Sequence, residues 1–180
     1  MVRWTRAVGV FTGALALVAA LQFWAFVQSE RALLSLVGLE VNGGAPKAGD
    51  LSVHVLVRFT NSGRIAASAG HFALGLRFGD LPQRPEYNDL PTFGSQPIPA
   101  GGGTEFYPTA PLSRALTQDE VDKVKSGALR MSLFGYIKYS DAFSFFGTTT
   151  IGFCSTYIPP PLGEAKFYNS CPEPSYTYAN

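Results

Sequence analysis

Residues 8–27 read VGVFTGALALVAALQFWAFV, and this stretch decides how the rest of the chain is organised. It carries no charge, and only Thr12 and Gln22 are clearly polar. As a helix it would extend about 30 Å, the thickness of the hydrocarbon core of a bilayer. The stretch therefore predicts a transmembrane anchor, and the sequence behind it has the pattern of a β-rich soluble domain.

The charges around this stretch predict its orientation. Arg3 and Arg6 precede it, whereas Glu30 and Arg31 behind it nearly cancel. Basic residues are retained on the cytoplasmic side of a membrane. We therefore expect a single pass through the cytoplasmic membrane, with the C-terminal domain on the extracytoplasmic side.

A cleaved signal peptide would also begin with basic residues and an apolar core. Its cleavage site is what this sequence lacks, because residues 14–16 (Ala-Leu-Ala) lie too early and no such pair of small residues occurs near Val27. A buried core helix would be shorter. Trp4 and Trp24 near the two ends suit membrane interfaces. The pattern favours an uncleaved anchor.

Small residues inside the anchor form a possible dimer motif. Gly9 and Gly13 have the G-x-x-x-G spacing that lets two membrane helices approach closely. The motif is short, and Gly is frequent in membrane helices. A homo-oligomer through Gly9 and Gly13 is thus a candidate, although simple composition is the favoured interpretation.

Length and composition bound the rest of the chain. The 180 residues divide into an anchor and stalk (1–34) and one domain (35–180) that is large enough for a hydrophobic core. The 19 Gly and 13 Pro punctuate short apolar runs, which is typical of many turns and strands. The formal net charge is +1 and no basic stripe is present, so nucleic-acid binding has no electrostatic support.

Alternating apolar residues predict the strands of the domain. In residues 51–60, Leu51, Val53, Val55, Val57 and Phe59 fall on one face. Further strands are expected at residues 36–41, 70–78, 104–107, 129–140 and 143–158. We predict a mainly β fold, with an immunoglobulin-like antiparallel β-sandwich as the leading arrangement and a small closed barrel as the runner-up.

One short helix interrupts the strands. Thr117 and Glu120 have the spacing of a capping box, and Gly127 is placed to end the helix. The sequence therefore predicts a helix over residues 118–126 that lies on the sandwich rather than inside it.

The two cysteines, Cys154 and Cys171, form a disulfide candidate. A bridge in an exported domain is favoured over two free thiols, because such a domain meets oxidising conditions. It would tie an irregular tail, extending to Asn180, to the last strand.

Residues 80–103 contain five prolines and predict a long surface connection. Aromatic residues lie in or beside it, namely Tyr87, Phe93, Phe106 and Tyr107. These rings form a candidate loop for binding a partner or stacking on a sugar. The favoured alternative is that they cover the end of the sandwich.

Several stretches together, rather than any single one, carry a resemblance to known proteins. They are the anchor, Asn61-Ser62-Gly63, Ile98-Pro99-Ala100-Gly101, the capped helix, residues 135–143 (GYIKYSDAF), residues 150–154 (TIGFC) and a second Cys near the C-terminus. In this order they resemble an uncharacterised group of short single-pass bacterial membrane proteins. The resemblance implies an inner-membrane protein with an exported β-sandwich, and it implies no activity.

The sequence offers no catalytic constellation. His54 and His71 are expected on adjacent strands, yet no third residue has the spacing of a metal ligand. Nucleophile and metalloprotease motifs are missing, and no carboxylates are paired. We therefore expect no enzyme, cofactor or metal site. We expect a membrane-anchored interaction or structural module of the bacterial envelope, with the lipid bilayer and an envelope protein as partners; the alternative is a small-ligand or glycan-binding domain that uses the loop aromatics.

Overall fold

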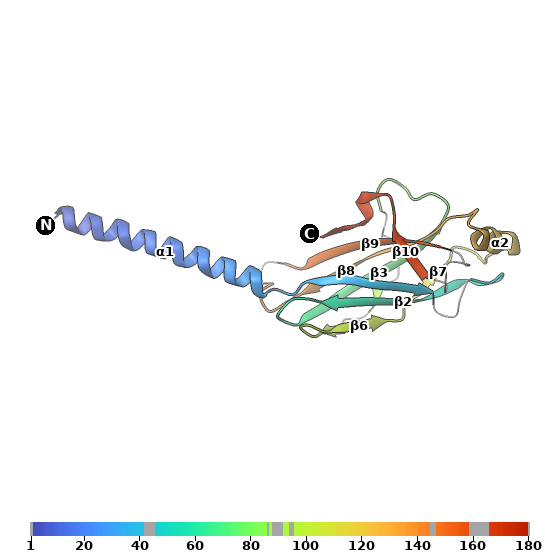
Figure 1. Cartoon of the computed structure of the whole chain (residues 1–180), viewed down its shortest axis with the longest axis horizontal. Coiled ribbons are helices and arrows are strands. Elements are labelled where there is room, and N and C mark those ends of the chain that lie inside the picture. Colours follow the sequence, from blue (N-terminus) through green and yellow to red (C-terminus); the bar gives the residue numbers. More distant parts are fainter. Residues whose placement is uncertain are drawn as a thin grey trace.

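The computed structural model describes residues 2–41, 46–85, 87, 92–93, 96–144, 147–158 and 166–179. It shows an apolar N-terminal helix followed by a mainly β domain (Figure 1).

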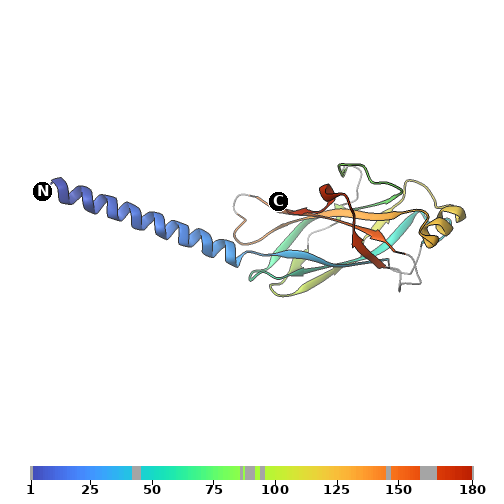
Figure 2. The same ribbon diagram turned by 45° about the horizontal axis from the view of Figure 1, so that its top comes forward.

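The N-terminal helix α1 (Val2–Glu30) projects from one end of the β domain (Figures 1 and 2). Its part from Val8 to Glu30 is long and apolar enough to cross a membrane, and no residue of its most apolar window is buried. A Cβ added at Gly9 or Gly13 would have no other atom within 4 Å. Helix α1 thus has the length and apolar surface that the sequence predicts, and the dimer motif stays a prediction.

Eleven strands and two short helices make up the described part of the domain. They are β1 (Leu34–Val41), β2 (Ser52–Asn61), β3 (Ala67–Phe78), β4 (Thr92–Phe93), β5 (Gln96–Ile98), β6 (Gly103–Phe106), β7 (Thr109–Pro111), α2 (Gln118–Ser126), β8 (Met131–Ser140), β9 (Thr149–Tyr157), β10 (Lys166–Ser170), the 3-10 helix η1 (Pro174–Tyr176) and β11 (Tyr178–Ala179).

The strands form two antiparallel sheets. The larger has the order β4-β3-β8-β9-β10-β1-β2-β6, with β5 also on β3 and β11 also on β9. The smaller pairs β2 with β7. Among the described residues no ladder joins β6 to β3, so the closed barrel is not formed there.

The main core lies between the two ends of the larger sheet. Phe59 of β2 packs edge-on against Phe72 of β3 and Phe153 of β9, with ring centroids 6.0 and 5.8 Å apart. The alternation predicted for β2 is confirmed from Val53 to Phe59, where every second side chain is buried. Leu51 is the exception, because it precedes the strand and is exposed.

A second, smaller core covers the opposite face of the sheet at β8 and β9. It consists of Leu81, Phe134, Cys154, Cys171 and Tyr176, with Tyr87 packed against it. Phe134 is therefore buried. The C-terminal segment supplies part of this cover, because Cys171 and Tyr176 belong to the second core and η1 contacts β9.

The expectation of an irregular tail is wrong. Strand β10 pairs with β9 through Phe167 and Tyr157, and with β1 through Leu39 and Phe167. It thereby joins the two halves of the larger sheet. Local sequence could not reveal this, since a strand is stabilised here by partners that are distant in the chain.

Helix α2 is confirmed with its predicted bounds. Glu120 N donates to the Thr117 hydroxyl, Thr117 N donates to the Glu120 carboxylate, and Gly127 ends the helix with φ of 77°. Val121 and Val124 are buried, so the helix packs on the domain through these two residues. It lies at the end of the domain opposite α1 (Figures 1 and 2).

The Pro-rich segment is more ordered than a plain connection. The short strands β4 and β5 both pair with β3, and Pro97 lies opposite Ser68 in the β5 ladder. A proline fits this position because β5 pairs with β3 alone among the described strands, so its free edge needs no donor.

Candidate functional site

The junction between α1 and the β domain is held by Asp141, which follows β8. Its Oδ2 accepts from Arg31 Nε at 3.2 Å and from the Ala32 amide at 3.1 Å. Its Oδ1 accepts from the Phe143 amide at 3.0 Å and the Ser144 hydroxyl at 2.9 Å. The Asp141 side chain has no exposed surface. A buried carboxylate is tolerated here because four donors replace its water.

These donors also set the acidity of Asp141. Burial by itself raises the pKa of a carboxyl group, but the hydrogen bonds from Ser144, the Ala32 amide and Arg31 outweigh it. The pKa of Asp141 therefore lies below its ordinary value, and the group is a carboxylate at neutral pH.

Asn61 holds the other side of the same junction. Its Oδ1 accepts from the amides of Leu33 at 3.1 Å and Gly63 at 3.0 Å. Its Nδ2 donates to the carbonyls of Ile65 at 2.8 Å and Ile98 at 3.3 Å. This fully buried amide thus uses all its hydrogen-bonding capacity, and it ties the linker to the turn after β2.

The linker lies too close to this turn for any side chain at position 63. A Cβ on Gly63 would stand 2.2 Å from the Arg31 carbonyl oxygen and 2.6 Å from the Ala32 Cα. The Ser62 amide donates to the Leu33 carbonyl at 2.9 Å, and Arg64 pairs with Glu30 at 2.8 Å. Glycine is required here for space, and the three residues between α1 and β1 are bound along their length.

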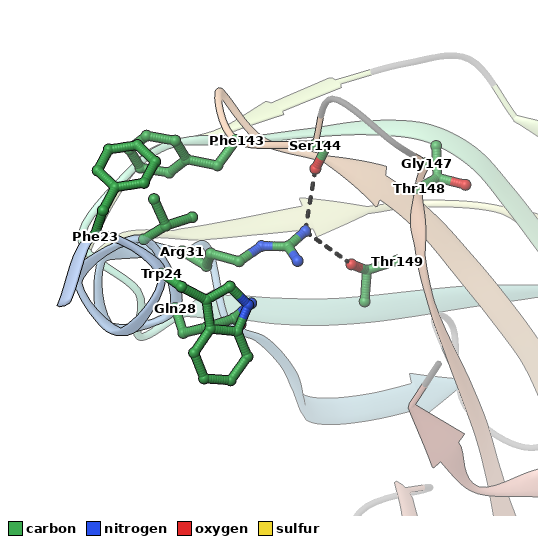
Figure 3. A pocket seen from close by; sticks show the side chains of 10 residues that line it. Phe23, Trp24, Gln28, Arg31, Phe143, Ser144, Gly147, Thr148 and Thr149 are labelled. Carbon is green, nitrogen blue, oxygen red and sulfur yellow. Dashed lines mark hydrogen bonds between the residues drawn. The ribbon is translucent and has the colours of Figure 1, made fainter. Parts of the chain in front are cut away.

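A pocket of about 650 Å³ opens between the end of α1 and the segment that joins β8 to β9 (Figure 3). It is lined by Phe23, Trp24, Val27, Gln28, Arg31, Phe143, Ser144, Gly147, Thr148 and Thr149. The wall that comes from the last turns of the helix is mainly apolar, with Phe23, Trp24 and Val27 beside Gln28. The other wall includes Phe143 and is mainly polar, because Arg31 Nη2 donates to the hydroxyls of Ser144 at 3.2 Å and Thr149 at 3.5 Å.

We call this the junction pocket. Its described side chains supply one guanidinium, several hydroxyls, an amide and three aromatic rings, and none of them is a histidine, cysteine or carboxylate. Such a set can bind an amphipathic molecule by hydrogen bonds and apolar contact. Among the described lining residues, no two are paired as nucleophile and base.

Of the four aromatic residues proposed for a binding loop, Phe106 requires a correction. Only 8% of its surface is exposed, and its ring stacks on Phe72 with centroids 5.3 Å apart. Tyr87 packs edge-on against Tyr136 at 4.8 Å, where burial and neighbouring tyrosines raise its pKa. The Phe106 ring therefore belongs to the main core, and the Tyr87 ring packs against the second core.

The other two members are placed differently. Tyr107 is 63% exposed, and Phe93 lies opposite Phe72 in the β3–β4 ladder, with its side chain outside the described part. The structure therefore does not gather the four rings at one exposed loop. Sequence alone could not separate them, because an aromatic residue at a strand end suits either a core or a surface.

Tyr107 belongs to an exposed polar row on β1, β2 and β6. Arg58 pairs with Glu40 at 2.6 Å and with Glu105 at 2.8 Å. The Tyr107 hydroxyl donates to Glu105 at 2.6 Å, and this bond together with Arg58 lowers the pKa of Glu105. We call Glu40, Arg58, Glu105 and Tyr107 the polar row.

The two histidines are not neighbours. His54 lies on β2 and His71 on β3, and these strands are far apart in the sheet order. His54 Nδ1 lies 3.1 Å from the Thr109 hydroxyl. Within the described residues no three His, Cys, Asp or Glu side chains are grouped to hold a metal ion.

Cys154 and Cys171, the disulfide candidate, are joined by a bridge with Cα atoms 5.4 Å apart. The bridge lies in the second core and fastens the C-terminal segment to β9. The junction pocket, in contrast, was not foreseen. The only sequence signals were Arg31 directly after the apolar stretch and Asp141 in a turn, and nothing in the sequence pairs them.

No protein-family model matches the chain, and no curated protein matches it. The case for a function therefore rests on the geometry.

Proposed function

We propose that this chain is a single-pass inner-membrane protein that holds an extracytoplasmic domain in a fixed orientation on the membrane surface. The domain acts as an interaction or structural module of the bacterial envelope and has no enzymatic activity. One observation carries this proposal: the residues between α1 and β1 are bound to Asp141 and Asn61 rather than free.

A flexible tether would serve if the domain only needed to stay near the membrane. Here the Arg31 side chain and the Ala32 and Leu33 amides are all bonded to the domain, and Gly63 leaves no space around them. Bending at this linker would break several hydrogen bonds to buried groups, each of which costs about 1–3 kcal/mol to leave unmade. A fixed orientation suits a module that presents its surfaces to a partner.

The strand order supports an immunoglobulin-like arrangement for this module. The neighbours β3-β8-β9 correspond to strands C, F and G of that fold, and β1-β2-β6 correspond to A, B and E. Helix α2 lies in the connection between the counterparts of E and F. The departure is β10, which joins the edges of the two halves.

The alternative of a glycan or small-ligand domain has less support, because it relied on the four loop aromatics. Phe106 is buried and Tyr87 is packed into the second core. Tyr107, in the polar row, remains as an exposed ring that a partner could contact.

The test has two arms in intact bacterial cells. A reporter that is active only outside the cytoplasm, fused after Asn180, should be active. A photo-reactive residue at position 107 should give a discrete cross-linked product, whereas the same residue at the buried position 121 should not.

A matched variant tests the fixed orientation. A Gly-Ser-Gly-Ser insertion between Glu30 and Arg31 keeps every bond within the domain but releases the helix, and it should weaken the cross-linked product. A cytoplasmic domain, or a product unchanged by the insertion, would contradict the proposal.

A further inference from the structure

The fold of the domain does not require the aromatic residues with which α1 lines the junction pocket. Phe23 and Trp24 remain largely exposed, and their rings stand beside the opening rather than inside a core (Figure 3). The apolar wall is continuous with the helix surface from Val8 onward, none of which is buried in its most apolar window. If α1 spans the membrane, as proposed above, the molecules that reach this wall are lipids.

The depth of the pocket along α1 also agrees with contact to lipids. Trp24 precedes the end of α1 at Glu30 by six residues, or about 9 Å along the helix axis. The hydrocarbon core ends near Val27, where the apolar stretch ends, and the headgroup layer adds about 5–7 Å on each side. The pocket therefore extends from the outer end of the acyl chains to the depth of the headgroup phosphates.

The polar wall has hydrogen-bond donors that the described residues do not use. The bonds of Arg31 use its Nε and Nη2, and none to the described residues uses Nη1. The Thr149 hydroxyl accepts from Arg31, which leaves its own proton to donate. Asp141 fixes the guanidinium and offsets its charge, so the wall suits one phosphodiester without a preference for strongly anionic lipids.

We propose that the junction pocket binds one phospholipid from the outer leaflet of the membrane that α1 spans. Arg31 and Thr149 bind the phosphodiester, and Phe23, Trp24 and Val27 contact the acyl chain. The bound lipid fills the space between helix and domain and so belongs to the fixed joint.

Native mass spectrometry of the full-length chain, released from detergent micelles, tests this. The probes are dioleoyl phosphatidylglycerol, dioleoyl phosphatidylethanolamine, dioleoylglycerol and inorganic phosphate, added one at a time. Both phospholipids should give a complex with one lipid per chain. Dioleoylglycerol, which has the same chains without the phosphate, and inorganic phosphate should each be retained about tenfold less, the effect of one charge-assisted hydrogen bond or more.

Two variants and two matched controls locate the site. Arg31→Gln and Trp24→Ala should each lower phospholipid retention about tenfold. Arg64→Gln removes a charge at the same level, and Phe26→Ala removes a ring from α1 outside the pocket, so both should retain lipid as the wild type does. If Arg31→Gln fails to fold, Trp24→Ala decides, because Trp24 lies on the helix and outside the domain.

The inference is overturned if dioleoylglycerol is retained as well as the phospholipids, if only phosphate binds, if no lipid binds, or if Trp24→Ala retains lipid like Phe26→Ala. The same spectra give the intact mass of the chain. A mass that lacks the helix would overturn the membrane anchor itself, whereas an intact chain without lipid overturns only the lipid site.

Discussion

At the scale of single residues, two buried polar side chains hold the junction together by hydrogen bonds. The side chains of Asp141 and Asn61 have no exposed surface and together bind the backbone amides of Ala32 and Leu33. Such residues are costly to bury and are tolerated only when every donor and acceptor is used. Substituting either of them should therefore lower the free energy of unfolding more than breaking an exposed ion pair.

Asp141→Asn tests this directly. The amide keeps the shape but removes the charge that Arg31 faces and replaces an acceptor by a donor, so we expect the free energy of unfolding to fall by about 3 kcal/mol. Asp119→Asn, which breaks an exposed pair with Lys123, should cost less than about 1 kcal/mol. Urea unfolding of the full-length chain in detergent measures both, and equal effects would contradict the role of Asp141.

The lowered pKa of Asp141 also predicts a pH dependence. A carboxyl group whose pKa is lower in the folded state adds stability above its unfolded value, here 3.8, and this contribution is lost as the pH falls through the folded pKa. Unfolding free energy should therefore decrease below about pH 4. The free energy of unfolding of Asp141→Asn should fall less steeply with decreasing pH than that of Asp119→Asn. Urea titrations at a series of pH values measure both, and parallel curves would refute the role of Asp141.

Gly63→Ala tests the close approach of the linker. The added methyl group would meet backbone atoms of Arg31 and Ala32 that cannot turn aside, so the junction must open, at a cost of about 1–3 kcal/mol. Gly38→Ala, where a Cβ meets nothing within 4 Å, is the matched control and should change stability by less than about 0.5 kcal/mol. Thermal unfolding measures the stability of both variants, and equal losses would contradict the close approach of the linker to Gly63.

At the scale of elements, the C-terminal segment completes the domain. Strand β10 joins β9 to β1, β11 pairs with β9 in the same sheet, and η1 contacts β9. The Cys154–Cys171 bridge fastens this segment, and the Cys171 amide donates to the Cys154 carbonyl at 3.3 Å. The C-terminal segment is therefore part of the second core, to which it contributes Cys171 and Tyr176.

Removing the bridge should loosen this segment. Cys154→Ala and Cys171→Ala should each lower the free energy of unfolding by about 3 kcal/mol, and the double variant should lose little more, since all three lack the same bond. Reductant should weaken the wild type and leave the double variant unchanged. Thiol labelling of the unreduced, denatured chain that finds two free thiols would refute the bridge.

At the scale of the whole molecule, helix and domain meet in a joint rather than a stalk. Helix α1 ends at Glu30, and the next residues already belong to the domain, with Ala32 and Leu34 both buried. Two residues of the predicted anchor and stalk (1–34), Ala32 and Leu34, are thus buried, and the predicted division after residue 34 stays a prediction. Helix α2 lies at the end of the domain opposite α1 (Figure 1).

Two fragments test where the domain begins. Residues 31–180 should fold, whereas residues 35–180 should be less stable by about 3–5 kcal/mol, because they lack the buried Leu34 and the donors that Asp141 binds. Leu33→Ala in the longer fragment is the control, since the Leu33 side chain is exposed. Urea midpoints that coincide for the two fragments would return the boundary to residue 35.

The sequence by itself determined the features that depend on neighbouring residues. The unbroken apolar stretch determined a helix of membrane-spanning length, the alternation from Val53 to Phe59 determined the buried face of β2, and Thr117 with Glu120 determined the start of α2. Each is a local property, because helix capping and side-chain alternation involve residues only a few positions apart.

Only the tertiary structure decided the junction pocket, the insertion of β10 and the burial of Phe106. Arg31 and Asp141 are 110 positions apart, and β10 is stabilised by β1 from the other end of the domain. A charged residue after an anchor or an aromatic residue at a strand end is compatible with several environments. Which one it occupies depends on the elements that pack against it, and these are brought together only when the chain folds.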